Sequence, residues 1–345
     1  MLAGGLSGAL LLFVGLSWAI GTDPLRGLYN LIKPSPARVA ANPTLTVATG
    51  YRVSWLGDLE SRELAESSGL TDSQLHPGVL WSINDSGGDP ELFALDQAGR
   101  HIATVSLSDV SAFDWESLDS FVLEGVSYIA IGDIGDNLGW RREVRILVVP
   151  EPQQLRDTST RPAWTVTFHY PDGARDSEAM TTDLSGERFL IVSKRDHPPR
   201  LYSVPMRPAG PVTATHLIDL NHLPHQTEVE HEEERDGGRY RHMPSGMDYN
   251  PTSDRLLLTT YKDAYLYTVS DLRTAPIRVP LPTTGQREAI TWIDADRAIV
   301  SRERPDQTGD AELYEIVFNL LAAPEAPREG SLNEQSPVPP SPGEG

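Results

Sequence analysis

The stretch DWESLDSFVLEGVSYIAIGDIGDN, Asp114–Asn137, contains the opening of a pattern that recurs along the chain. An acidic residue, Glu116, stands among small and apolar neighbours, and an apolar run, YIAIGD, follows and ends in polar residues. Short apolar runs that alternate with polar residues and stop at Gly, Pro, Asp or Asn are typical of β-strands. The stretch therefore predicts strands. Its end poses a question, because the last strand leads directly into two carboxylates, Asp133 and Asp136, an amide and glycines.

The same order of elements occurs five times between Thr44 and Leu321. An acidic opening is followed by an apolar strand and then by a strand of period two, such as LYSVP from Leu201 or LYTVS from Leu266. Four units add a fourth strand, whereas the fifth unit ends before supplying one. Internal repetition of this kind is the signature of a repeat architecture. The opening acids are Glu66, Glu116, Glu178, Asp248 and Glu288.

Units of about four strands can bury their sheet faces against one another in a closed ring, which removes long free edges. The sequence therefore predicts an all-β fold, a single β-propeller with five blades over residues 44–321. A strand within Thr44–Leu59 is expected to close the last blade, so its deletion should unfold the protein. Six blades would result if a divergent unit lies within Asn221–Pro244, and a pair of β-sandwiches is the third alternative.

Nineteen uncharged, mostly apolar residues, Leu2–Ile20, precede this domain and are long enough to enter or span a membrane. Ser17 and Ala19 have the small side chains that signal peptidases require. Residues 1–22 are therefore predicted to be a signal peptide or a transmembrane anchor, with a buried helix as the alternative. Residues 23–43 would be a linker and residues 322–345 a disordered tail. The expected location is periplasmic or secreted, free or anchored in the inner membrane by the N-terminal segment.

The overall charge argues against nucleic acid as a partner. The chain has 49 acidic and 29 basic side chains, a formal net charge of −20. Such a surface repels phosphate backbones. Cysteine is absent, which excludes disulfides, thiolate metal sites and a cysteine nucleophile.

The first strand of each blade lines the central channel of a propeller, so the opening acids are predicted to surround one axis. Like charges at such close range cannot all stay ionised and unpaired; they need raised pKa values, cationic partners or a bound metal. The second strands of units three to five end in bases: Lys194, Arg195, Lys262 and Arg302. Units one and two end instead in oxygen donors: Asn84, Asp85, Asp133, Asp136 and Asn137. The ring of acids is therefore predicted to be electrostatically lopsided.

Carboxylate and amide oxygens gathered on one side, with glycines that let the backbone bend, suit Ca²⁺. Asp85, Asp133 and Asp136 are therefore predicted cation ligands, and Ca²⁺ is the predicted cofactor. Zinc is disfavoured because the chain lacks cysteine and a paired-histidine motif. The alternative is ordinary turn chemistry, in which Asp and Asn cap their own backbone.

The motifs ESSGL, NDSGG, FDWES, GDIGDN and PDGARDSEAM resemble those of a group of secreted bacterial β-propellers. They are more distantly similar to SdiA-regulated and phytase-like or esterase-like propellers, and the similarity covers roughly residues 66–317. The resemblance implies calcium in or near the channel, carried here onto Glu66, Asp85, Asp114 and Glu116. The double-aspartate clusters of phytases are not apparent, so phytase activity is not implied.

Other catalytic patterns are few. No G-x-S-x-G elbow, H-E-x-x-H, Walker loop or G-x-G-x-x-G is present. His197 is a candidate general base at the channel mouth. Lys194 and Arg195 beside it could receive an anionic ligand, unless they pair with Asp176 and Glu178. The histidine-rich segment from residue 220 to 242 is predicted to be a solvated loop, with weak metal binding as the alternative.

Two functions follow from these features. The first is a binding or scaffold module that presents an acidic channel to a protein or a small-molecule ligand. The second is a metal-assisted hydrolase of ester, lactone or phosphoester bonds, in which Glu116 or Glu178 activates water. Replacing these glutamates by glutamine separates the two, because only the enzyme would lose turnover without losing stability.

Overall fold

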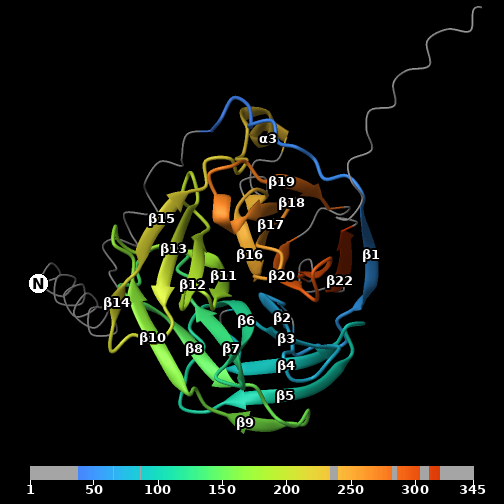
Figure 1. Cartoon of the computed structure of the whole chain (residues 1–345), viewed down its shortest axis with the longest axis vertical. Helices are drawn as coiled ribbons and strands as arrows, with labels where there is room; N and C mark the ends of the chain where they lie inside the picture. The colour runs from blue at the N-terminus through green and yellow to red at the C-terminus, as the bar shows by residue number, and fades with distance from the viewer. Residues whose placement is uncertain are drawn as a thin grey trace, which may run out of the picture.

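The computed structural model describes residues 38–64, 66–85, 87–233, 240–281, 286–303 and 311–318. Its strands form five sheets around one axis, so the predicted five-bladed β-propeller is confirmed (Figure 1). The apolar runs that predicted strands are buried on both faces: every residue of VLWSI in β3 (Val79–Ile83) is buried. Such strands lack polar alternation because a neighbouring blade covers each face.

The strands follow the predicted order in every blade. Blade one contains β2 (Gly69–Asp72), β3, β4 (Glu91–Asp96) and β5 (His101–Leu107). Blade two contains β6 (Trp115–Leu123), β7 (Val126–Asp133), β8 (Val144–Pro150) and β10 (Trp164–His169). Blade three contains β11 (Ser177–Asp183), β12 (Arg188–Ser193), β13 (Arg200–Pro205) and β15 (Thr215–Asp219). Blade four contains β16 (Pro244–Asn250), β17 (Arg255–Thr260), β18 (Asp263–Thr268) and β19 (Ile277–Pro280).

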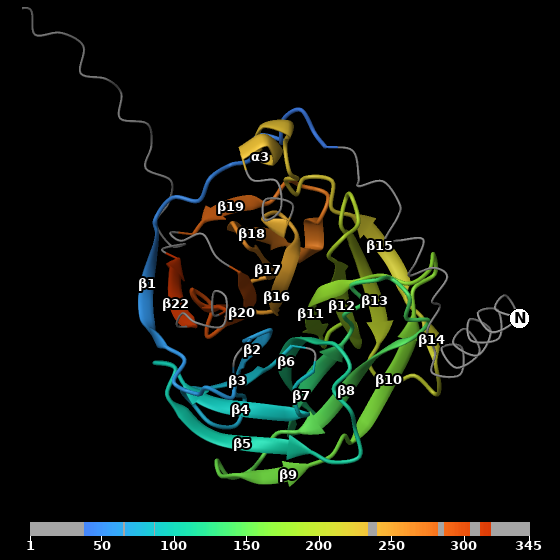
Figure 2. The ribbon, with the colours of Figure 1, turned by 180° about the vertical axis from the view of Figure 1, so that it is seen from behind.

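Blade five is closed by the N-terminal strand. Its order is β20 (Arg287–Trp292), β21 (Arg297–Arg302), β22 (Glu312–Phe318) and then β1 (Tyr51–Asp58), which runs antiparallel to β22 with Tyr51 opposite Phe318. This confirms the predicted closure, and β1 lies beside β22 in both views (Figures 1 and 2). The strand is shorter than the segment from Thr44 that predicted it. Val47 instead pairs with Arg278 at the outer edge of blade four.

The innermost strands form the channel. In sequence order β2, β6, β11, β16 and β20 each pack against the next, and β20 packs against β2. Hydrophobic layers fill the space between adjacent blades. Between blades two and three, for example, Ile146 and Val148 meet Phe189 and Tyr202, all of them fully buried. Tyr202, in the third strand of blade three, therefore packs between blades.

Two short strands extend the blades in a way that the sequence did not predict. β9 (Thr158–Thr160) belongs to the connection inside blade two but pairs in parallel with β5 of blade one. β14 (Val212–Thr213), from the connection inside blade three, pairs likewise with β10 of blade two. Each connection thus reaches back and covers the edge of the preceding blade, which removes an exposed edge.

The histidine-rich segment contributes no sixth sheet within the part of the chain that the structure describes. It contains a short helix, α3 (Glu228–Glu233), where a solvated loop was predicted. Thr227 and Glu230 form a capping box at its start: Glu230 N donates to Thr227 Oγ1 at 3.2 Å and Thr227 N to Glu230 Oε2 at 3.0 Å.

The predicted leader (residues 1–22), most of the linker and the predicted tail (residues 322–345) lie outside the described residues. Within the described ranges, no helix has the length and hydropathy needed to traverse a bilayer.

Candidate functional site

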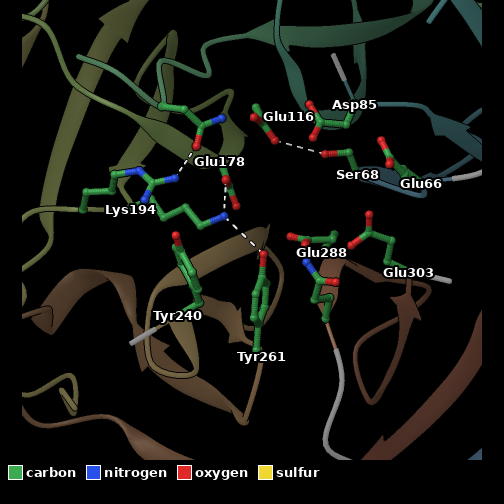
Figure 3. A pocket seen from close by; sticks show the side chains of 13 residues that line it. Glu66, Ser68, Asp85, Glu116, Glu178, Lys194, Tyr240, Tyr261, Glu288 and Glu303 are labelled. Atoms are coloured by element: carbon green, nitrogen blue, oxygen red, sulfur yellow. Dashed lines mark hydrogen bonds and ion pairs between the residues drawn. The ribbon is translucent and has the colours of Figure 1, made fainter. Parts of the chain in front are cut away.

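A pocket opens where the first strands begin and the second strands end, and all five blades line it (Figure 3). Its cavity volume is about 220 Å³. The lining residues are Glu66, Ser68, Asp85, Glu116, Asn137, Glu178, Lys194, Arg195, Tyr240, Tyr261, Gln286, Glu288 and Glu303. Six of these side chains are carboxylic acids, so the predicted acidic channel is present at this face.

A β-bulge at the start of the first strand sets the position of three lining acids. The pairing register shifts between Trp115 and Ser117, so Glu116 is the extra residue in β6. Glu178 in β11 and Glu288 in β20 occupy the same bulged position. A bulge leaves one residue outside the ladder and redirects its side chain. The repeated acid thus reaches the channel because each strand contains the same irregularity.

The repeat predicted five converging acids, and the structure corrects the fourth. In β16 the bulged residue is Ser245, because the register shifts between Pro244 and Gly246. Asp248 lies three residues further along the strand and is not among the residues that line the pocket. The acid of SGMDY therefore belongs to a different level of the channel. Glu66, two residues ahead of Ser68, does line the pocket although it precedes β2.

The first acidic cluster consists of Asp85, Asp114 and Glu116, whose ligand oxygens all lie within 4.8 Å of one another. Ser68 Oγ donates to Glu116 Oε2 at 3.1 Å, whereas the buried Glu116 Oε1 has no hydrogen-bond partner. Glu116 is only 3% exposed. A buried carboxylate oxygen without a donor is costly. This oxygen is therefore placed to bind a ligand.

Gly135 explains why the stretch after β7 contains glycine. A Cβ atom at this position would lie 2.5 Å from Asp114 Oδ2 and 2.5 Å from Glu116 Oε1. The backbone of the GDIGDN turn thus covers the two carboxylates directly, and only glycine leaves room for them.

The second acidic cluster joins Glu116 to Asp176 and Glu178, again within 4.8 Å. Here basic side chains neutralise the acids. Lys194, 5% exposed, forms an ion pair with Glu178, and Arg195 forms one with Asp176. This confirms the predicted pairing of these two bases. The predicted lopsided charge holds only in part, because among the described residues that line the pocket only those of blade three are basic, and blade five adds a further acid, Glu303. The other two predicted bases pair away from the pocket, Lys262 with Glu230 and Arg302 with Glu312.

Burial and mutual repulsion raise the pKa values of the pocket acids. Burial, with added repulsion from Asp85 and Asp176, raises the pKa of Asp114 to about 7. Burial and the neighbouring Glu178 raise the pKa of Glu116 well above its usual range. The pKa of Glu178 is also raised by burial, although Lys194 opposes the shift. The acids of the first cluster thus repel one another, and a cation between them would relieve this repulsion.

On the side of the pocket formed by blades four and five, two carboxyl groups, Glu288 and Glu303, lie next to each other. Glu288 hydrogen-bonds to Glu303 and to Tyr261, and Tyr261 OH also lies 3.3 Å from Lys194 Nζ. Burial and repulsion from Glu288 raise the pKa of Glu303 to about 8. A hydrogen bond between two carboxyl groups requires a proton on one of them.

Asp133 and Asp136, predicted as ligands, have other partners. Both oxygens of the fully buried Asp133 are held in ion pairs, with Arg141 and with Arg145 at 2.8 Å each. Asp136 caps a turn by accepting the N–H groups of Trp140 and Arg141 at 2.9 Å. Neither residue lines the pocket. For these two residues the turn and ion-pair alternative applies, and we remove them from the predicted ligands.

His197, predicted as a base at the channel mouth, does not line the pocket. Its ring meets the ring of His225 edge to face, with centroids 3.4 Å apart, and burial lowers its pKa. We therefore remove His197 from the predicted catalytic residues.

Sequence reasoning missed several lining residues that share a simple position. Lys194, Tyr261 and Glu303 each directly follow the second strand of their blade. In blades three to five, the residues predicted at the ends of the second strands were the basic ones. Of Lys194, Tyr261 and Glu303 only Lys194 is basic, so the other two were not predicted. Aligning the blades on the end of the second strand would have found them. Ser68 directly precedes β2 and corresponds in position to Glu116 of blade two. An alignment of the first strands of the blades would therefore have identified it.

No protein-family model and no curated protein sequence matches the chain. Similar solved structures include a gluconolactonase from Xanthomonas campestris, 13% identical, with a TM-score of 0.42 over 83% of this chain and 98% of the other. The PQQ-bound aldose sugar dehydrogenase from Streptomyces coelicolor is 12% identical, with a TM-score of 0.39 over 81% and 99%. The Pan2 WD40 domain from Neurospora crassa is 9% identical, with a TM-score of 0.41 over 78% and 97%. Likeness at this level assigns no activity.

Proposed function

We propose that the pocket binds a divalent cation, with Ca²⁺ the best fit, and that the protein is an extracytoplasmic module that presents this pocket to a small-molecule ligand. The observation that carries the proposal is the unpartnered Oε1 of Glu116 beside Asp85 and Asp114. The second cluster has Lys194 and Arg195 as counter-charges. Beside the first cluster, Arg141 is paired with Asp133, and Lys194 lowers the pKa of Glu116 while it is held in its ion pair with Glu178. The first cluster is therefore the better cation site.

The donor set favours Ca²⁺ over other metals. All three ligands are carboxylates, and Ca²⁺ accepts six to eight oxygens in flexible geometry, so water from the open pocket can complete its shell. Zinc prefers nitrogen and sulfur ligands. The site contains neither histidine nor cysteine among the residues that the structure describes around it.

The extracytoplasmic location is supported by the apolar stretch Leu2–Ile20 and fits the lack of cysteine. A calcium site exposed to millimolar Ca²⁺ outside the cytoplasm needs only modest affinity. Fractionation of cells that express the full chain tests this part of the proposal: recovery of the protein in the cytosol would contradict it.

Thermal unfolding tests the cation site. At a free Ca²⁺ concentration of 100 times the dissociation constant, binding stabilises the folded state by about 2.7 kcal/mol, which raises Tm by roughly 5–10 °C. We expect this shift for the wild type relative to chelator and expect Glu116→Gln to abolish it.

The matched control is Glu151→Gln. Glu151 is as buried as Glu116, but its carboxylate accepts bonds from Ser73, Trp81 and Ser127 outside the pocket. This variant should be less stable and still respond to Ca²⁺. The cation site is wrong if the wild type shows no shift, or if both variants lose it equally.

A second candidate function is hydrolysis, and the observation that favours it is a second unpartnered carboxylate oxygen in the pocket. Glu178 Oε2 is buried without a hydrogen-bond partner, while Lys194 holds Oε1. Glu178 thus has one oxygen available to accept a proton from water, and its raised pKa suits a general base. A cation at the first cluster would polarise the oxygen of an ester, lactone or phosphoester.

Glu178→Gln separates the two candidates. Gln keeps the size of the side chain but cannot accept the proton, so hydrolysis of a panel of such substrates should fall at least about 100-fold. The Ca²⁺-dependent rise in Tm should remain. If the wild type hydrolyses nothing in the panel and still binds Ca²⁺, the binding function stands and the hydrolase reading fails.

A further inference from the structure

Three residues below the bulged positions, a second level of polar side chains circles the channel axis. The members, one from each first strand, are Thr71, Asp119, Thr181, Asp248 and Thr291. Threonine and aspartate alternate from Thr71 to Thr291. Hydrogen bonds between blades link the level into a chain, and it is this level to which the acid of SGMDY belongs.

The oxygens of Asp119 receive a full set of donors. Ser120 N donates to Oδ1 at 2.7 Å, and Thr182 N donates to Oδ2. Thr181 Oγ1 lies 3.2 Å from the same Oδ2. Asp119 is 6% exposed. A carboxylate that accepts three donors, two of them backbone N–H groups of its own and the next blade, is stabilised as the anion.

Asp248 has a different pattern. Its Oδ2 accepts Trp292 N at 2.7 Å and Thr291 Oγ1 at 3.1 Å. Within the residues that the structure describes, its Oδ1 has one hydrogen-bond neighbour, Thr181 Oγ1 at 3.3 Å. Asp248 as a residue is only partly buried, although protein atoms surround its carboxyl group.

The number of hydrogens available around Thr181 determines how many protons Asp119 and Asp248 carry. Thr181 Oγ1 has one hydrogen and two lone pairs, and Tyr249 N already donates to it at 3.0 Å. Its single hydrogen can serve Asp119 Oδ2 or Asp248 Oδ1, not both. If both carboxyls were ionised, one oxygen would face Thr181 without a donor. A proton on Asp248 Oδ1 completes the count, because that O–H donates to Thr181, and Thr181 donates to Asp119.

We propose that Asp119 and Asp248 hold one proton between them, bound at Asp248 Oδ1 and shared through Thr181, and that this proton locks blades two to five together below the pocket. The series of hydrogen bonds runs from Asp119 in β6 to Thr181 in β11. It continues to Asp248 in β16 and ends at Thr291 in β20. Asp72 N of blade one then donates to Thr291 Oγ1 at 3.2 Å, which joins the first blade to the fifth.

The electrostatics agree with this assignment. Burial and the charge of Asp119 raise the pKa of Asp248 well above its usual range. Burial also raises the pKa of Asp119, to about 6, and hydrogen bonds from Thr182 and Ser120 limit that rise. Other titratable groups at this end of the channel include Asp72, Asp183, Asp294, Arg188, Arg297, Glu151, Tyr249, Asp254, Arg255 and Asp296. Asp183 pairs with Arg188 and Asp294 with Arg297, while the pKa of Asp72 is raised by burial and Glu151 to about 7.

The sign of the pH effect follows from the raised pKa. The folded protein keeps a proton that the unfolded chain loses above pH of about 4. Stability from this proton is therefore present at acidic pH and is lost as pH rises toward the folded-state pKa. Because Asp72 titrates in the same range, only the difference between the wild type and a variant isolates the pair.

The test compares denaturant unfolding of the full chain and Asp248→Asn from pH 5 to pH 9, without added metal. The asparagine N–H₂ can replace the proposed O–H toward Thr181 while its oxygen accepts Trp292 N. We expect equal stability near pH 5. Above that pH the unfolding equilibrium constant of the wild type should rise relative to the variant by up to about tenfold per pH unit. Parallel pH profiles would overturn the proposal.

Asp119→Asn and infrared spectroscopy give the independent readout. In Asp119→Asn the amide N–H₂ would face a backbone donor, so this variant should be destabilised at every pH. At pH 7 the difference spectrum between the wild type and Asp248→Asn should show the carbonyl band of a protonated carboxylic acid, and Asp119→Asn should retain that band. Absence of the band from the wild type, or its loss only in Asp119→Asn, would refute the assigned proton.

Discussion

At the scale of single residues, the site depends on Glu116 and Gly135. A β-bulge directs the side chain of Glu116 into the channel, and the lack of a side chain at Gly135 leaves room for it. Glu116 was predictable because the acid recurs in successive units. Asp248 was misplaced because the short motifs SGMDY and DWESL align equally well in two registers, and only the bulge at Ser245 distinguishes them. A register error of three residues moves a side chain to another level of the channel.

Gly135→Ala tests the close approach of the turn to the carboxylates. The added Cβ would lie 2.5 Å from oxygens of Asp114 and Glu116, so either the turn or both side chains must move. We expect Ca²⁺ affinity measured by calorimetry to fall at least about tenfold, a loss of about 1.4 kcal/mol. Gly210→Ala, where nothing lies within 4 Å of the added atom, should bind as the wild type does. Unchanged affinity in both variants would contradict the geometry of the site.

At the scale of elements, strands with clear hydrophobic patterns were predictable, and elements fixed by a few polar contacts were not. β9 and β14 have only three and two residues, too few for a periodic signal. The helix α3 was hidden in a charge-dense run that favoured a loop. Its start nevertheless carries the pattern T-x-x-E at Thr227–Glu230, which predicts a capping box.

Glu230→Gln tests what ties α3 to blade four. Burial opposes ionisation of Glu230, but Lys262 at 2.8 Å, Thr227 N and His242 lower its pKa to about 2. A lowered carboxyl pKa stabilises the fold above pH of about 4.5, and this stability disappears as pH falls toward 2. We expect the variant to lose about 0.5–1 kcal/mol at pH 7, reduced by solvent screening, and nothing near pH 2.

Glu228→Gln is the matched control for that experiment, because Glu228 is exposed in the same helix. Its free energy of unfolding should match the wild type at both pH values. Equal losses in the two variants at pH 7 would show that the ion pair with Lys262 contributes nothing specific.

At the scale of the whole molecule, closure by β1 joins the two ends of the chain in one blade. The sequence predicted this because the last unit lacked a strand and a spare one preceded the first unit. The strand pairs with β22 along its whole length, from Tyr51 to Asp58. Opening one blade exposes an edge and the layers packed against both its neighbours, so the ring should unfold cooperatively.

Deleting residues 51–58 tests closure directly. We expect loss of the cooperative thermal transition followed by circular dichroism, together with rapid proteolysis. A chain that lacks residues 38–46 keeps β1 and provides the control, since it should melt in a single transition. Cooperative melting of the chain without β1 would show that closure is dispensable.

The bases Lys194 and Arg195 were predicted from the end of the second strand of blade three, because charge signs are visible in sequence, whereas Lys262 and Arg302 pair elsewhere. The family resemblance pointed to Glu66, Asp85, Asp114 and Glu116, and the last three of these meet. That Asp133 and Asp136 lie outside the site was not predictable, because the bulges, the Gly135 contact and the ion pairs of Asp133 depend on the folded backbone. The most direct measurement is therefore an anomalous difference map from a crystal grown with Ca²⁺. A peak between the carboxylates of Asp85, Asp114 and Glu116 is the predicted result; a channel mouth without a peak, or a peak beside Asp133 and Asp136 instead, would contradict it.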